Sequence, residues 1–102
     1  MLGGMMEKLQ AAQEKMEEVK ARLDGITVVG EAHGIKVIVN GNKLVKNIDI
    51  PQMIIDDADK EQMEDLLLLA LNRGLESAEN ISQAENASAM KGVIPNIPGM
   101  GF

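Results

Sequence analysis

The stretch Gly34–Pro51, which reads GIKVIVNGNKLVKNIDIP, carries the strongest structural signal in the chain. The apolar residues Ile35, Val37 and Val39 recur at every second position, which is the period of a half-buried β-strand. Asn40-Gly41 then predicts a type I′ turn, because both central positions of that turn need φ > 0. Leu44–Ile50 is the predicted return strand. An isolated hairpin is at best marginally stable in water, so other parts of the chain must cover its apolar face.

The residues before this hairpin predict a third strand. Ile26–Ala32 alternates weakly between apolar and polar residues, and His33-Gly34 has the composition of a turn. Three sequential strands of this length form an antiparallel meander over residues 26–50. The register of the last strand stays open, because the alternation places Lys46 among the apolar residues and Val45 opposite them.

A helix is predicted on each side of the meander, over residues 5–24 and 59–91. In the first helix, apolar residues spaced alternately four and three apart form a narrow seam about five turns long. In the second, Asp59 and Gln62 resemble a capping box. Its first half is apolar nearly all round, whereas the second half carries mostly small apolar residues and is expected to project into solvent. We expect residues 93–102 to be a mobile tail. The seam of the first helix consists of Met5, Leu9, Ala12, Met16, Val19, Leu23 and Ile26.

The size and composition predict one small cytoplasmic domain of the α+β class. The chain has 102 residues, of which 45% are hydrophobic, and it has no cysteine, which excludes disulfides and thiolate metal sites. One meander and half of one helix cannot bury all the apolar surface of both helices. A two-fold homodimer is the commonest remedy. The predicted interface residues are Leu66, Leu67, Leu68, Leu69 and Leu71.

The charge pattern leaves a basic surface only in the first half of the chain. The formal net charge is −6, and residues 51–102 carry three bases and nine acids. On the first helix, Lys8, Lys15 and Arg22 recur every seven residues beside the seam, and Lys20 lies on its other flank. These side chains could track DNA phosphates, or they could lay their stems over the seam and keep their charges in water.

Catalytic and cofactor sites are not expected. Asp56, Asp57 and Asp59 lack the spacing of a calcium loop and are better explained by helix capping. His33 fits a turn residue, and no nucleophile–base pair is evident. The longest apolar run, Leu66–Leu71, is too short to span a bilayer. The sequence therefore predicts neither an enzyme nor a metal, cofactor or small-molecule site.

The order of motifs resembles the YbaB/EbfC family of bacterial nucleoid-associated proteins over nearly the whole chain. The matching features are a Met/Gln/Lys-rich amphipathic helix, a G-x-K-V-x-V-N-G strand and turn, a strand ending I-D-x-P, an acidic cap, an M-E-D-L-L and A-L-N helix, and a Pro-Gly-Met tail. The residues that carry them are Gly34, Lys36, Val37, Val39, Asn40, Gly41, Ile48, Asp49, Pro51, Met63–Leu67 and Ala70–Asn72.

This resemblance implies an α-β-β-β-α protomer, a tweezer-shaped homodimer and a non-enzymatic DNA-binding role in the cytoplasmic nucleoid. Its helical arms would grip duplex DNA, mainly through phosphates. The alternative that stays open is a dimeric protein-binding adaptor or chaperone-like module with little DNA affinity, which the acidic C-terminal half favours. The candidate DNA-binding residues are Lys8, Lys15, Lys20, Arg22 and Lys91.

Overall fold

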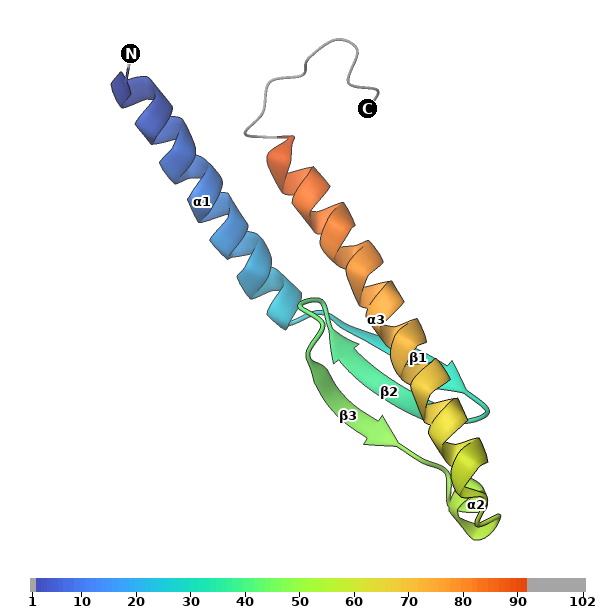
Figure 1. The fold of residues 1–102 in the computed structure, drawn as a ribbon. Coiled ribbons are helices and arrows are strands. Elements are labelled where there is room, and N and C mark those ends of the chain that lie inside the picture. The colour runs from blue at the N-terminus through green and yellow to red at the C-terminus, as the bar shows by residue number, and fades with distance from the viewer. Residues whose placement is uncertain (1, 92–102) are drawn as a thin grey trace, which may run out of the picture.

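The structure, a computed structural model, describes residues 2–91. Its elements follow the predicted α-β-β-β-α order, with one short additional helix (Figure 1). The residues of the predicted tail, 93–102, lie outside the described range. The helices and strands are α1 (Leu2–Asp24), β1 (Thr27–Ala32), β2 (Ile35–Asn40), β3 (Val45–Asp49), α2 (Gln52–Asp56) and α3 (Lys60–Met90).

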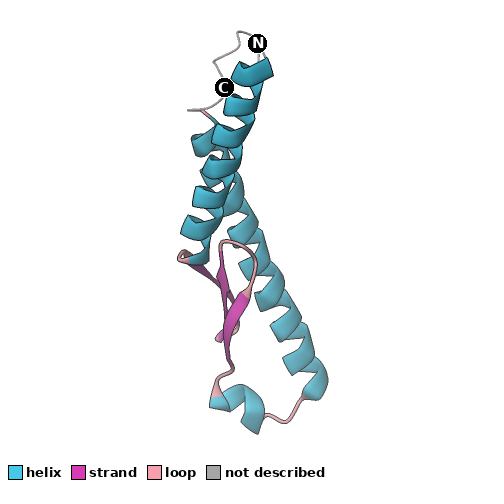
Figure 2. Cartoon of the chain, turned by 90° about the vertical axis from the view of Figure 1, so that its left-hand side faces the viewer, coloured by secondary structure: helices cyan, strands magenta, loops and turns pink. Residues whose placement is uncertain are grey.

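The three strands form the predicted antiparallel meander, in the order β1-β2-β3. Helix α3 packs against β1 and β2, which leaves β3 at an open edge of the sheet. The molecule is elongated, with extents of 67 × 27 × 16 Å. Figures 1 and 2 show why: α1 and the second half of α3 project together from one end of the sheet, while α2 lies near the other end.

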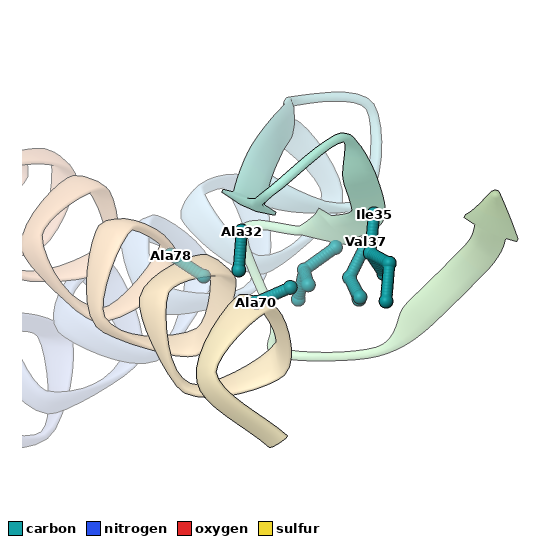
Figure 3. Packing of buried hydrophobic residues seen from close by; sticks show 6 residues of the cluster. Ala32, Ile35, Val37, Ala70 and Ala78 are labelled. Atoms are coloured by element: carbon teal, nitrogen blue, oxygen red, sulfur yellow. The ribbon is translucent and has the colours of Figure 1, made fainter. Parts of the chain in front are cut away.

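The core lies between β2 and the middle of α3. Ile35, Val37 and Val39 alternate along β2 and are fully buried, as the period of two predicts. They meet Ala70 and Ala78, which are fully buried on α3 (Figure 3). Small residues on the helix let it approach the sheet closely, and the largest fully buried side chains are those of the strand.

Two glycines mark the point of closest approach between α3 and β1. A Cβ atom on Gly30 would overlap the carbonyl oxygen of Ala70 and the amide nitrogen of Gly74. A Cβ atom on Gly74 would come within 2.9 Å of a methyl group of Val39. Gly30 and Gly74 are both buried. They are therefore required by helix–sheet packing and not by backbone conformation.

The turn between β2 and β3 differs from the type I′ turn predicted at Asn40-Gly41. Neither of these residues has positive φ, and the turn is longer, with Lys43 at φ 66°. The Asn40 side chain is 2% exposed, and its Oδ1 accepts hydrogen bonds of 3.0 Å from the amides of Asn42 and Leu44. A side-chain acceptor thus organises this turn. Positive φ at both central positions occurs instead at His33-Gly34, which joins β1 to β2.

The register of β3, left open by the sequence, is settled by a β-bulge. Ile38 pairs with Asn47 and Val39 pairs with Val45, so Lys46 is the additional residue on β3. Because the bulge shifts the alternation by one, Val45 and Ile48 both lie on the side of the sheet that faces α3. Since α3 does not reach β3, both side chains remain exposed.

The connection to α3 contains the short helix α2, which the sequence did not predict. Pro51 precedes α2, and a reversal at Ala58, with φ 53°, separates it from α3. Asp59 is the N-cap of α3, and its Oδ1 accepts a hydrogen bond of 3.0 Å from the Gln62 amide. This bond confirms the prediction that Asp59 caps the helix.

We expect Asn40→Ala to destabilise the fold by about 1–3 kcal/mol, because it removes the acceptor of two turn amides in a buried setting. Thermal unfolding at one fixed protein concentration measures the loss. Asn47→Ala, at an exposed position on β3, is the matched control and should change the stability little. Equal stability of the two variants would show that the Asn40 side chain does not hold the turn.

Candidate nucleic-acid interface

Helix α1 is an arm that touches the rest of the protomer mainly at its C-terminal end. Of its seam residues, Val19 and Leu23 are buried, whereas Met5, Leu9 and Met16 are more than half exposed. A regular apolar seam therefore runs the length of α1, but only its last two turns are covered within one chain.

The base of this arm is held by the turn between β2 and β3. The Gly41 amide donates to the carbonyl oxygens of Leu23 at 3.0 Å and Ile26 at 2.9 Å. Asn42 Nδ2 donates to the Lys20 carbonyl oxygen at 2.9 Å and to Asp24 Oδ1. These bonds attach the β2–β3 turn to the last turn of α1 and to the residues that follow it. A Cβ atom on Gly41 would come within 2.7 Å of the Leu23 side chain, so this contact also requires a glycine.

The four candidate DNA-binding residues on α1 are all exposed. Because Lys8 and Arg22 are fourteen residues apart in one continuous helix, they are separated by about 21 Å along its axis. Lys15 Nζ lies 3.5 Å from Glu18 on the same helix. Within the described residues, Lys8 and Lys20 form no ion pair. The arm thus presents a row of cations, of which those at positions 8 and 20 are not neutralised locally.

Arg22 is the exception, because it pairs with an acid on the other arm. Its Nη1 donates to Glu85 Oε2 at 2.7 Å, which ties the last turn of α1 to the second half of α3. The Arg22 side chain remains 52% exposed and that of Glu85 27% exposed. The Glu85 carboxylate thus already accepts a hydrogen bond from Arg22, which the sequence predicts as a DNA contact.

Lys91 lies directly after α3, where its backbone amide donates to Ala87. It is exposed. Because α1 and α3 run antiparallel and Arg22 meets Glu85, Lys91 lies six residues, or about 9 Å, farther out along α3. The structure thus brings Lys91 near the same part of the arms as the α1 bases.

The acids of the second half of α3 are partly neutralised within the chain. Glu79 pairs with Lys43 of the β2–β3 turn, and Glu85 pairs with Arg22. Hydrogen bonds from Lys43 and Gln83, with the nearby Lys43 charge, lower the pKa of Glu79. Glu76 is exposed and forms no ion pair among the described residues. The arm is therefore less repulsive to phosphate than its sequence alone indicates.

The leucines of the predicted dimer interface divide into two groups. Leu66, Leu67 and Leu71 are partly buried and pack against the core of their own chain. Leu68 and Leu69 are exposed, at 59% and 41%. Other large apolar side chains that are exposed in the protomer lie before and on β3 and on α2: Leu44, Val45, Ile48, Met53 and Ile55.

Sequence reasoning missed two residues that form ion pairs with distant parts of the chain. Lys43 ties the β2–β3 turn to α3, and Glu85 ties α3 to α1. Their partners are 36 and 63 positions away along the chain, so no spacing rule finds them. The only available signal was the pair of helical arms that the family resemblance implies, and this resemblance does not say which residues of the two arms meet.

Among the described residues, no group of acids and histidine is placed to hold a metal ion. None of the helices within residues 2–91 combines the length and the hydropathy needed to cross a bilayer.

Comparison with known proteins identifies the fold and its relatives. The model of the YbaB/EbfC DNA-binding family matches residues 1–93. A nucleoid-associated protein of Flavobacterium johnsoniae is 39% identical over 97% of this chain and 93% of its own. One of Clostridium kluyveri is 37% identical over 97% of this chain and 87% of its own. The crystal structure of an uncharacterized protein from Helicobacter pylori has the same fold, with a TM-score of 0.64, 20% identity, and coverage of 74% of this chain and 90% of that one.

Proposed function

Because the chain belongs to the YbaB/EbfC DNA-binding family, we propose that it binds duplex DNA as a homodimer, with contacts mainly to phosphates. The observation that carries this proposal is the exposed row of bases on a projecting helix. The row spans about 21 Å, which corresponds to about six base pairs of B-DNA. The proposed contacts come from both protomers: Lys8, Lys15, Lys20, Arg22 and Lys91.

Base-specific readout plays little part in this proposal. The chain has one aromatic residue, Phe102, and so lacks platforms on which single-stranded bases could stack. It also lacks a helix-turn-helix or zinc-finger pattern. Contacts of Lys and Arg with phosphates position a protein on DNA without reading the sequence. We therefore expect weak affinity with little sequence preference, and a non-enzymatic role in organising the cytoplasmic nucleoid.

The proposed dimer uses the apolar surface around Leu68 and Leu69. Exposed apolar patches of this kind commonly mark protein–protein contacts. Leu66, Leu67 and Leu71 would then contribute indirectly. They pack against the core of their own chain and so hold in place the helix that carries the two exposed leucines. A two-fold axis through this surface doubles the arms and so doubles the basic rows available to one duplex.

Gel-shift titration of duplex DNA at two salt concentrations tests the phosphate contacts. The test variant replaces Lys8, Lys15 and Arg22 with alanine. The matched control replaces Lys36, Lys46 and Lys60, which are exposed on β2, on β3 and at the start of α3, so both variants lose the same charge. We expect weaker binding only in the test variant, with a salt slope that flattens by about 0.9 log units per log unit of salt for each lost contact.

Two results would contradict the proposal in different ways. Equal binding by the two triple variants would show that the row on α1 is not the DNA site. If the unsubstituted protein shifts no DNA at low salt and micromolar concentration, the adaptor function is favoured. The exposed seam residues Met5, Leu9 and Met16 would then be its candidate docking surface.

A further inference from the structure

The contact between Arg22 and Glu85 places a carboxylate where the proposed function requires a phosphate. Carboxylate and phosphate oxygens accept the same charge-assisted hydrogen bonds from a guanidinium. The 2.7 Å bond from Arg22 Nη1 to Glu85 Oε2 uses one of the five N–H donors of the side chain. With the arginine side chain 52% exposed, a phosphate can reach it from solvent.

We propose that Glu85 competes with DNA phosphate for Arg22, so that DNA binding exchanges an internal carboxylate for an external phosphate. This inference rests on the proposed function, because it assigns a role to a residue beside the same basic row. Glu85 thereby sets the affinity of the arm for DNA without contacting DNA itself.

The geometry permits this exchange without detaching α1. Leu23 is 3% exposed, and the backbone bonds from Gly41 hold the end of the helix. The second ion pair, between Lys43 and Glu79, ties the turn to α3 independently of Arg22. When a phosphate takes Arg22, the base of the arm therefore keeps its remaining contacts.

Exposed ion pairs are weak, which sets the size of the expected effect. Removal of the competing charge by Glu85→Gln should tighten DNA binding by about two- to fivefold for each protomer that contacts the duplex. The matched control is Glu76→Gln, which removes the same charge from the same helix at an exposed position. It should tighten binding by less, because Glu76 pairs with no base among the described residues.

A double-substitution cycle separates competition from general charge repulsion. DNA affinity is measured at one low salt concentration for the unsubstituted protein, Glu85→Gln, Arg22→Gln and the double variant. The inference requires that Glu85→Gln tightens binding more when Arg22 is present than in the Arg22→Gln background, where it should tighten binding by no more than Glu76→Gln does.

Three outcomes would overturn the inference. Equal tightening in both backgrounds would mean that Glu85 acts only through its net charge. Weaker binding by Glu85→Gln would mean that the carboxylate positions Arg22 for DNA instead of competing for it. Absence of binding by every variant and by the unsubstituted protein would refute the proposed function itself, and this inference with it.

Discussion

Gly30→Ala is expected to lower the free energy of unfolding by at least about 3 kcal/mol, at the upper end of the cost of overpacking a core. The new methyl group would overlap backbone atoms of Ala70 and Gly74, which cannot move aside as a flexible side chain can. Relief requires α3 to lift away from β1, which would open the packing around the fully buried Ala70. A loss of this size corresponds to a fall in Tm of about 12–24 °C.

Gly4→Ala is the control for this substitution. No atom lies within 4 Å of the position of a Cβ at Gly4, which is on the exposed part of α1. Alanine favours a helix over glycine by about 1 kcal/mol, so this variant should be as stable as the parent or slightly more stable. Both are compared by thermal unfolding at one protein concentration, because the Tm of the proposed dimer would depend on concentration. A Gly30→Ala variant with unchanged Tm would refute the close packing of α3 on β1.

Leu68→Glu is expected to separate the proposed dimer into monomers. Leu68 is 59% exposed in the protomer, so the substitution costs the isolated chain little. In a two-fold interface the same change buries two like charges beside each other, which is strongly unfavourable. Light scattering should give twice the chain mass of 11.0 kDa for the unsubstituted protein and a single chain mass for the variant.

Gln62→Glu is the control for the effect of charge on α3. Gln62 is exposed in the first turn of the helix, where an acid suits the helix dipole. This variant should remain dimeric. A mass of 11.0 kDa for the unsubstituted protein at micromolar concentration would contradict the proposed dimer. A dimeric Leu68→Glu variant would instead place the interface elsewhere.

The fold was largely predictable because its signals are local. The alternation in β2, the heptad seam of α1 and the Asp59 cap each act over a few residues, and each predicted the element that is observed. The β2–β3 turn was mispredicted for a physical reason. Asn40-Gly41 has the composition of a two-residue turn, but the Asn40 side chain accepts two backbone amides and stabilises a longer one.

The candidate site was less predictable because its contacts are between distant parts of the chain. The bases of α1 follow from their spacing, whereas the pairing of Arg22 with Glu85 depends on how two helices are placed. The roles of Gly30 and Gly41 likewise depend on close approach to other elements. A sequence without aligned relatives does not distinguish these glycines from ordinary turn glycines.

The β2–β3 turn holds the last turn of α1. A tilt of the helix about Leu23 therefore moves its N-terminal end farthest. Lys8 lies fifteen residues, or about 22 Å, from Leu23, so a tilt of about 10° moves it by about 4 Å. Such a displacement exceeds the tolerance of a hydrogen bond to phosphate. Small changes at Gly41 or Asn42, which have no proposed contact with DNA, would therefore move the proposed phosphate contacts of the arm.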